Sequence, residues 1–180
     1  MPSHTRPTSP VEALRRHFGH QEFRPGQEEI ILSVLSRNDT LVVMPTGGGK
    51  SLCYQIPALL LDGVTVVVSP LIALMKDQVD ALSRQDVRAT TINSTLDFPE
   101  VRQRMTDIRY GLYSLVYVAP ERFDSPSFLD LMSGLNVSLF AVDEAHCISE
   151  WGHDFRPSYT RLREAADAMK RPPIIALTAT

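Results

Sequence analysis

A glycine-rich run near residue 50 has the residue types and the spacing of a phosphate-binding loop. It reads Met44-Pro-Thr-Gly-Gly-Gly-Lys-Ser51 and joins an apolar, β-rich run to a segment with helical periodicity. Consecutive glycines let backbone N–H groups surround a phosphate, Lys50 can reach its oxygens, and the Ser51 hydroxyl is a ligand for Mg²⁺. The residues expected to bind the triphosphate are Pro45, Thr46, Gly47, Gly48, Gly49, Lys50 and Ser51.

The same run departs at one position from the full pattern of such loops. The pattern G-x-x-x-x-G-K-S has glycine where Met44 stands in this chain. The alternative interpretation is a glycine-rich turn with an exposed lysine, but a strand before the loop and a helix after it favour nucleotide binding. On its own, the loop predicts a bound nucleoside triphosphate and leaves open the process that it drives.

Two adjacent carboxylates, Asp143 and Glu144, follow an apolar run that begins at Leu139. Ligands of parallel sheets bind at the carboxyl ends of strands, which is where this pair is expected to lie. Asp143 is suited to hold Mg²⁺ together with Ser51, and Glu144 to orient and deprotonate an attacking water. Alternatively, the pair only caps the next helix. Because Lys50 lies upstream, we expect Lys50, Asp143 and Glu144 to be the catalytic residues of a Mg²⁺-dependent hydrolase.

The elements that must position these groups alternate between strands and helices. Nearly continuous apolar runs predict strands at 40–44, 64–69, 89–93, 115–119, 138–143 and 174–178. Helical periodicity predicts helices at 24–35, 51–61, 71–84 and 99–110. This alternation indicates an α/β fold with a doubly wound, mainly parallel sheet flanked by helices.

The ends of the chain set the expected domain limits. Residues 1–9 are rich in Pro, Ser and Thr and are expected to form a flexible tail, and residues 10–180 a single domain. The last predicted strand runs almost to the C-terminus with no helix after it. We therefore expect the first lobe of a longer chain.

Composition excludes several classes of protein. The chain has 180 residues, of which 43% are hydrophobic and 22% charged, as in globular domains rather than disordered chains. It lacks an apolar run long enough to span a membrane, and two cysteines, Cys53 and Cys147, make no disulfide framework. The net charge of −3 carries no overall basic signature of a nucleic-acid binder. We expect a cytoplasmic protein that does not contact a membrane.

Residues 143–146, Asp-Glu-Ala-His, extend the carboxylate pair into a sequence that resembles the second motif of superfamily 2 helicases. The Met-Pro-Thr-Gly start of the phosphate loop also resembles that superfamily, which commonly lacks the first glycine. Further stretches are similar to motifs of the RecQ family of DNA helicases: residues 18–27 to its adenine-recognition motif, 68–78 to motif Ia, 117–122 to motif Ib, 147–156 to its aromatic-rich loop and 177–180 to motif III. The resemblance covers roughly residues 10–180.

The resemblance implies that His20, Arg24 and Gln27 bind the adenine end of ATP. A glutamine amide donates and accepts at once, so Gln27 can select ATP over GTP. The planar Arg24 guanidinium can stack on the base or reach a phosphate, and the His20 imidazole can stack where relatives often have an aromatic. The alternative for Gln27 and Arg24 is a solvated helix face.

The loop after residues 143–146 (the DEAH sequence, in one-letter code) combines aromatic, basic and polar side chains. Such side chains can stack on unpaired bases and contact phosphate. Alternatively, Trp151 packs in the core. The resemblance implies a loop that senses single-stranded DNA and reports to the ATP site, with threonines linking the DEAH strand to neighbouring motifs. The residues expected to sense DNA or couple it to ATP are His146, Ser149, Trp151, His153, Phe155, Arg156, Thr178 and Thr180. Lys76, Arg88 and Arg122 are either phosphate contacts or solvated surface.

The family resemblance implies the N-terminal, RecA-like lobe of a two-lobed, 3′-to-5′ DNA helicase that uses ATP and Mg²⁺ in repair or recombination. The expected partners are single-stranded or duplex-junction DNA and a second lobe of the parent chain, whose arginine completes the ATP site. The isolated chain is expected to be a monomer and nearly inactive, and the parent to associate with the nucleoid if bacterial. Two alternatives stay open: a superfamily 2 RNA helicase lobe, and a binding module without catalysis.

Overall fold

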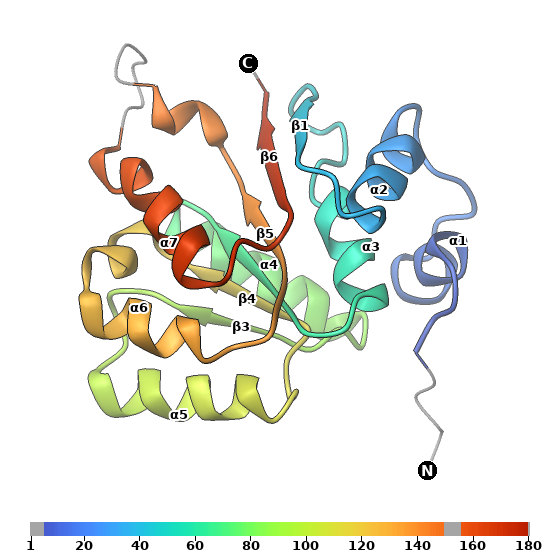
Figure 1. The fold of residues 1–180 in the computed structure, drawn as a ribbon. Coiled ribbons are helices and arrows are strands. Elements are labelled where there is room, and N and C mark those ends of the chain that lie inside the picture. The colour runs from blue at the N-terminus through green and yellow to red at the C-terminus, as the bar shows by residue number, and fades with distance from the viewer. Residues whose placement is uncertain (1–5, 150–155, 180) are drawn as a thin grey trace.

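The computed structural model describes residues 6–149 and 156–179, which form a six-stranded sheet. The strands are β1 (Thr40–Val43), β2 (Val64–Val68), β3 (Ala89–Ile92), β4 (Leu115–Val118), β5 (Val137–Val142) and β6 (Ile174–Thr178). Their order is β1-β6-β5-β2-β4-β3, and every pair of neighbours is parallel (Figure 1). The predicted α/β class with a parallel sheet is confirmed.

Helices cover both faces of the sheet, as the apolar strands require. The helices of one face are α2 (Gln27–Leu35), α3 (Leu52–Leu60) and α4 (Ile72–Arg84), and those of the other are α5 (Phe98–Arg109), α6 (Pro126–Ser133) and α7 (Leu162–Ala168) (Figure 1). Successive side chains of a strand point to opposite faces, so Val66 and Val68 pack in one core and Val67 in the other. All residues of β2, β4 and β5 are buried.

The helices begin where capping chemistry allows. Asp97 caps α5 by accepting from the Glu100 backbone N–H at 2.8 Å, and Glu100 accepts in return from the Asp97 N–H at 3.0 Å. Helix α2 starts three residues later than predicted, because Gly26 takes a left-handed conformation (φ 83°) that ends the preceding turn.

The N-terminal segment packs against the domain from Arg6 onward. Arg6 donates to the Leu59 carbonyl at 3.1 Å and pairs with Asp62, and Ser9 caps the short helix α1 (Pro10–Ala13). A short π-helical stretch, Leu14–Phe18, follows α1, and Gly19 is its C-terminal cap. The predicted tail and domain limits, 1–9 and 10–180, stay predictions, and residues 1–5 lie outside the described part.

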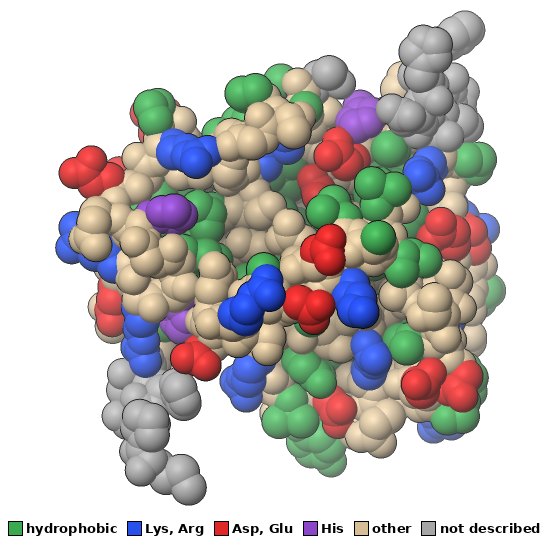
Figure 2. All heavy atoms as spheres, turned by 180° about the vertical axis from the view of Figure 1, so that it is seen from behind, with side chains coloured by type: hydrophobic (Ala, Val, Ile, Leu, Met, Phe, Trp, Pro, Cys, Tyr) green, Lys and Arg blue, Asp and Glu red, His purple; other side chains and the backbone are tan. Residues whose placement is uncertain are grey.

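The surface carries interspersed charges. Figure 2 shows basic and acidic side chains mixed across one face, in keeping with the net charge of −3. None of the helices within residues 6–149 and 156–179 is long and apolar enough to cross a membrane.

Candidate nucleotide-binding site

The carboxyl ends of the strands bring the phosphate loop and the carboxylate pair to one edge of the sheet. The loop follows β1 and the pair follows β5, with β6 between these strands. A cavity of about 480 Å³ lies at this edge. Its lining residues are His20, Glu22, Arg24, Gln27, Gly47, Gly49, Lys50, Ser51, Leu52, Leu74, Gln78, Asp143 and Glu144. Residues from four separate segments of the chain therefore face a single cavity.

The backbone of the phosphate loop requires glycine at positions 48 and 49, but it does not require glycine at position 44, where Met44 stands. Gly49 has φ 83°, in the left-handed region, and a Cβ on Gly48 would lie 2.8 Å from the Pro45 carbonyl oxygen. Met44 keeps a negative φ, and its N–H continues the sheet by donating to the Thr178 carbonyl at 3.1 Å. The departure from the full loop pattern therefore costs no backbone strain.

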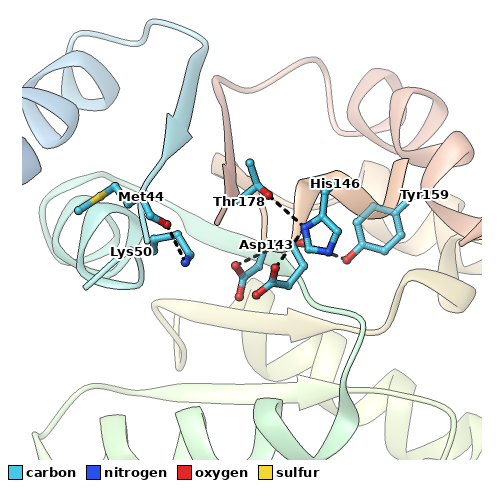
Figure 3. A network of polar contacts seen from close by, with 7 residues as sticks. Met44, Lys50, Asp143, His146, Tyr159 and Thr178 are labelled. Carbon is cyan, nitrogen blue, oxygen red and sulfur yellow. Dashed lines mark hydrogen bonds and ion pairs between the residues drawn. The ribbon is translucent and has the colours of Figure 1, made fainter. Parts of the chain in front are cut away.

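Lys50 and Ser51 lie at the start of α3, on the wall of the cavity. The Lys50 ammonium donates to the Met44 carbonyl at 3.2 Å, across the loop (Figure 3). Pro45, Thr46 and Gly48 belong to the loop but do not line the cavity. Helix α3 begins at Leu52, so its N-terminal end faces the same space and favours an anion.

Asp143 and Glu144 are held by a sharp turn at the end of β5. The Asp143 N–H donates to the Val68 carbonyl at 2.9 Å, and its own carbonyl accepts from the Tyr159 hydroxyl at 3.0 Å. Glu144 is left-handed (φ 50°, ψ 47°), and its N–H donates to Asp143 Oδ1 at 3.0 Å. This turn presents both carboxylates to the cavity.

Burial raises the pKa of Asp143 to about 6. The hydrogen bond from the Glu144 N–H lowers this pKa, the neighbouring Glu144 carboxylate raises it, and Lys50 and His146 lower it. The positive groups around Asp143 thus offset only part of the cost of burying its charge.

The donor set beside Asp143 fits Mg²⁺. The Ser51 hydroxyl and the Asp143 carboxylate line the same cavity, and both offer the oxygen ligands that this ion prefers. A divalent cation would also offset the carboxylate charge that burial penalises. Within the described residues, no group of three or more His, Cys, Asp or Glu side chains forms a separate metal site.

His146 connects the end of β5 with the end of β6. Its Nδ1 lies 3.0 Å from Thr178 Oγ1 and 3.3 Å from Glu144 Oε2. Figure 3 shows the His146 ring and the Thr178 hydroxyl pointing toward one another, with Asp143 alongside. Two of the residues expected to couple the motifs are therefore in contact, and both lie next to the carboxylate pair.

The turn before α2 supplies the other end of the cavity. Gln27 is 1% exposed, accepts from the Arg24 N–H at 2.8 Å and donates to the Gly49 carbonyl at 3.0 Å. The Arg24 guanidinium donates to the Gly47 carbonyl. Together with His20, these residues form one wall of the cavity and are joined to the phosphate loop.

The predicted DNA-sensing loop is described only at its two ends. The Ser149 N–H donates to the His146 carbonyl at 3.0 Å, and the Arg156 N–H donates to the Cys147 carbonyl at 3.0 Å. Arg156 therefore lies close to the DEAH turn. The predictions for Trp151, His153, Phe155 and Thr180 lie outside the described residues.

Several residues near the site were not predicted. Glu22, Leu52, Leu74 and Gln78 line the cavity, and Tyr159 holds the DEAH turn. For Leu74 and Gln78, a signal was present in their spacing of four residues, which puts them on one helix face. Arg122 is not a purely solvated side chain, because it donates to the carbonyls of Asn93 and Leu96 and ties the β3–α5 loop. Its alternative role as a phosphate contact stays a prediction.

A parallel sheet with a glycine-rich phosphate loop after its first strand and a carboxylate pair at the carboxyl end of another strand, at the same edge of the sheet, defines a P-loop nucleotide-binding domain. The sequence profile described as DEAD/DEAH box helicase matches residues 24–180. The chain belongs to the DEAD/DEAH box helicase family.

Curated relatives include several named RecQ. The chain is 52% identical over 172 residues to ATP-dependent DNA helicase RecQ of Bacillus subtilis, covering 93% of this chain and 29% of that protein. It is 51% identical over 170 residues to ATP-dependent DNA helicase RecQ of Pasteurella multocida, covering 94% of this chain and 27% of that protein. The resemblance to RecQ helicases is confirmed, and the chain spans less than a third of the length of these two relatives.

Solved structures support the fold. A hypothetical ATP-dependent RNA helicase from Sulfolobus tokodaii matches with a TM-score of 0.67 and 22% identity, over 95% of this chain and 50% of that one. The DUF1998 helicase MrfA matches with a TM-score of 0.70 and 20% identity, over 100% of this chain and 30% of that one. At these identities, the matches establish the shared fold alone.

Proposed function

We propose that the chain is the ATP-binding and ATP-hydrolysing lobe of a RecQ-type DNA helicase. The observation that carries this proposal is the single cavity that joins Gln27, Lys50, Asp143 and Glu144. The 52% identity to a RecQ helicase supports the same conclusion.

The residues of the cavity divide the chemistry between them. Backbone N–H groups of the phosphate loop and the start of α3 bind the phosphates, and Lys50 offsets the charge on the β- and γ-phosphate oxygens. Ser51 and Asp143 would hold Mg²⁺, which supplies further charge neutralisation when bound. Glu144 orients the attacking water and accepts its proton. The product of this step is ADP and phosphate.

The selection of the base falls to the turn before α2. Gln27 uses one amide hydrogen and one carbonyl lone pair within the protein, which leaves one of each. That remaining donor and acceptor can pair at once with a ring nitrogen and the amino group on one edge of adenine, whereas guanine carries a carbonyl oxygen in place of that amino group. His20 and Arg24 line the same wall and can stack on the base.

The contacts of His146 support a role in coupling the ATP site to DNA. It bridges Glu144 and Thr178 and so links the proposed catalytic base with the end of β6. We infer that the loop at residues 149–156 contacts single-stranded or junction DNA and acts on the site through this bridge, in a parent protein that moves 3′ to 5′ during repair or recombination. In a bacterial cell, this work takes place at the nucleoid.

A second lobe is part of the proposal. The parent chain would supply an arginine that completes the site, and losing such a group costs about 10³–10⁵ in rate in related phosphoryl-transfer enzymes. We therefore propose that the isolated chain is a monomer that binds ATP, hydrolyses it very slowly and unwinds no DNA. Robust unwinding by the 180-residue chain would contradict this.

The proposal is tested by the ATPase rate of the parent protein with single-stranded DNA, with RNA of the same sequence and with neither. We expect stimulation by DNA, loss of turnover in Glu144→Gln and retained ATP binding in that variant. Stimulation by RNA alone would favour an RNA helicase lobe. Unchanged turnover in Glu144→Gln, or no turnover in the wild type, would contradict the assigned chemistry.

A further inference from the structure

Helix α4 forms a wall of the nucleotide cavity, although the sequence predicts no nucleotide contact for it. Leu74 and Gln78 both line the cavity. They are four residues apart and therefore lie on the same face of the helix. Gln78 is half-buried, and it is the polar side chain that α4 contributes to the cavity.

A series of hydrogen-bonded polar side chains near the start of α3 fixes the orientation of the Gln78 side-chain amide. Gln55 Nε2 donates to Gln78 Oε1 at 3.0 Å and to the Tyr117 hydroxyl at 3.3 Å. The Tyr117 hydroxyl lies 3.5 Å from that of Tyr54. Gln55 is 5% exposed and both tyrosines 1%. Polar groups buried to this extent keep their partners, so the arrangement resists rotation of the Gln78 amide.

The contact with Gln55 leaves the nitrogen of the Gln78 side-chain amide available for another hydrogen bond. Because the Gln78 carbonyl oxygen accepts from Gln55, its Nε2 group is the end left to face elsewhere. No oxygen in residues 6–149 and 156–179 accepts a hydrogen bond from Gln78 Nε2. A donor with no partner on the wall of a cavity can serve a ligand there.

The position of Gln55 tells which end of the cavity Gln78 approaches. Gln55 lies one helical turn after Ser51, and its N–H donates to the Ser51 carbonyl at 3.0 Å. Gln78, which contacts Gln55, therefore lies beside the phosphate end of the cavity rather than beside His20 and Arg24. Phosphate oxygens are acceptors only, and they are charged, which makes them strong partners for an amide N–H.

We propose that Gln78 is a further nucleotide-binding residue, whose amide donates to a phosphate oxygen of the bound triphosphate, and that Gln55 and Tyr117 are positioning residues that orient it. The inference rests on the proposed ATP site and extends it to α4. Since α4 follows β2 directly, the nucleotide would also be tied to residues 68–78, a segment outside the phosphate loop and the carboxylate pair.

The first test compares equilibrium binding of ATP with Mg²⁺ to the chain and to Gln78→Met, which keeps the side-chain length but removes the donor. We expect about tenfold weaker binding, the loss typical of one hydrogen bond to a charged group. Gln78→Glu adds a negative charge near the phosphates and should weaken binding further. Gln103→Met, at an exposed position on α5, is the matched control and should bind as the wild type does.

The second test separates positioning from packing. Tyr117→Phe should weaken ATP binding two- to threefold, and the double variant Tyr117→Phe/Gln78→Met should bind no more weakly than Gln78→Met alone. Additive losses would mean that Tyr117 acts only through stability. Thermal unfolding of each variant shows that the comparison is made between folded proteins.

The outcomes distinguish this inference from the proposed function. If Lys50→Ala abolishes ATP binding while Gln78→Met and Gln78→Glu bind like the wild type, the nucleotide site stands and the role of Gln78 is wrong. If the wild-type chain binds no ATP, the proposed function itself fails. Weaker binding in both Gln78 variants, about tenfold in Gln78→Met and more in Gln78→Glu, with Gln103→Met unchanged, supports the inference.

Discussion

Gln27 joins three parts of the nucleotide site, and replacing it tests all of them. Its amide bridges the Arg24 N–H and the Gly49 carbonyl, at 2.8 and 3.0 Å, and lies against the cavity. Gln27→Met keeps the length of the side chain and removes both hydrogen bonds. The variant therefore frees the turn before α2 from the phosphate loop and removes the groups assigned to adenine.

The size of the effect follows from these contacts. A hydrogen bond between neutral groups contributes about 1 kcal/mol net, and because Arg24 is exposed and Gly49 half-buried, water can replace part of each one. Two such bonds give a free energy of unfolding lower by about 2 kcal/mol, or a Tm lower by about 4–8 °C. For the nucleotide, loss of the adenine contacts should weaken ATP binding about tenfold and bring the affinities for ATP and GTP close together.

The assays are thermal unfolding and competitive binding of ATP and GTP to the chain, with Gln103→Met as the control. A normal Tm together with an unchanged preference for ATP in Gln27→Met would refute the reasoning. A lower Tm with the ATP preference intact would show that Gln27 supports the loop but does not read the base.

Three further predictions concern a buried carboxylate of the site, the hydrogen bond that holds the turn after β5, and the β3–α5 loop. Asp143→Asn should raise the free energy of unfolding at pH 7 without Mg²⁺ by about 1–2 kcal/mol, because burial raises the pKa of this carboxyl from 3.8 to about 6 and its charged form is costly. The gain should shrink as the pH falls from about 6 to 3.8 and vanish near about pH 3, where the carboxyl is protonated in both the folded and unfolded states; denaturant titrations at pH 7 and at about pH 3 check this, and a destabilised variant at pH 7 would contradict it. Tyr159→Phe should lower the free energy of unfolding by about 1–2 kcal/mol, because it leaves the Asp143 carbonyl without its 3.0 Å hydrogen bond, and an unchanged urea midpoint would count against that contact. Arg122→Ala should speed amide hydrogen exchange in residues 93–97 while leaving α6 unchanged, because the guanidinium holds the carbonyls of Asn93 and Leu96; equal exchange in both proteins would argue against this role.

The sheet could be predicted from the sequence because its strands are short apolar runs in an otherwise mixed chain. Residues 64–69, for instance, predict a strand, and β2 covers Val64–Val68 with every residue buried. Helices α6 and α7 were not predicted, since they have only 8 and 7 residues, too few for helical periodicity to stand out.

The site residues that belong to a recognisable sequence motif could be predicted. Those that reach the site only through tertiary packing could not. Lys50, Asp143 and Glu144 stand in recognisable local patterns, and the structure puts them around one cavity. Gln78 ends the segment 68–78 that resembles motif Ia, but that resemblance assigned it no role at the nucleotide site. Gln78 and Tyr159 reach the same region through tertiary contacts with Gln55 and with the Asp143 carbonyl. Such contacts depend on how α4 and the segment after the DEAH turn pack on the sheet, which a local pattern does not encode.

The central claim is that the cavity at the strand ends binds ATP with Mg²⁺, and equilibrium titration of the chain with ATP tests it most directly. The account predicts saturable binding of one ATP per chain in the wild type, weaker binding of GTP, and loss of binding in a folded Lys50→Ala variant. Equal affinity of the wild type and Lys50→Ala for ATP, or no binding by the folded wild type at millimolar ATP, would contradict it.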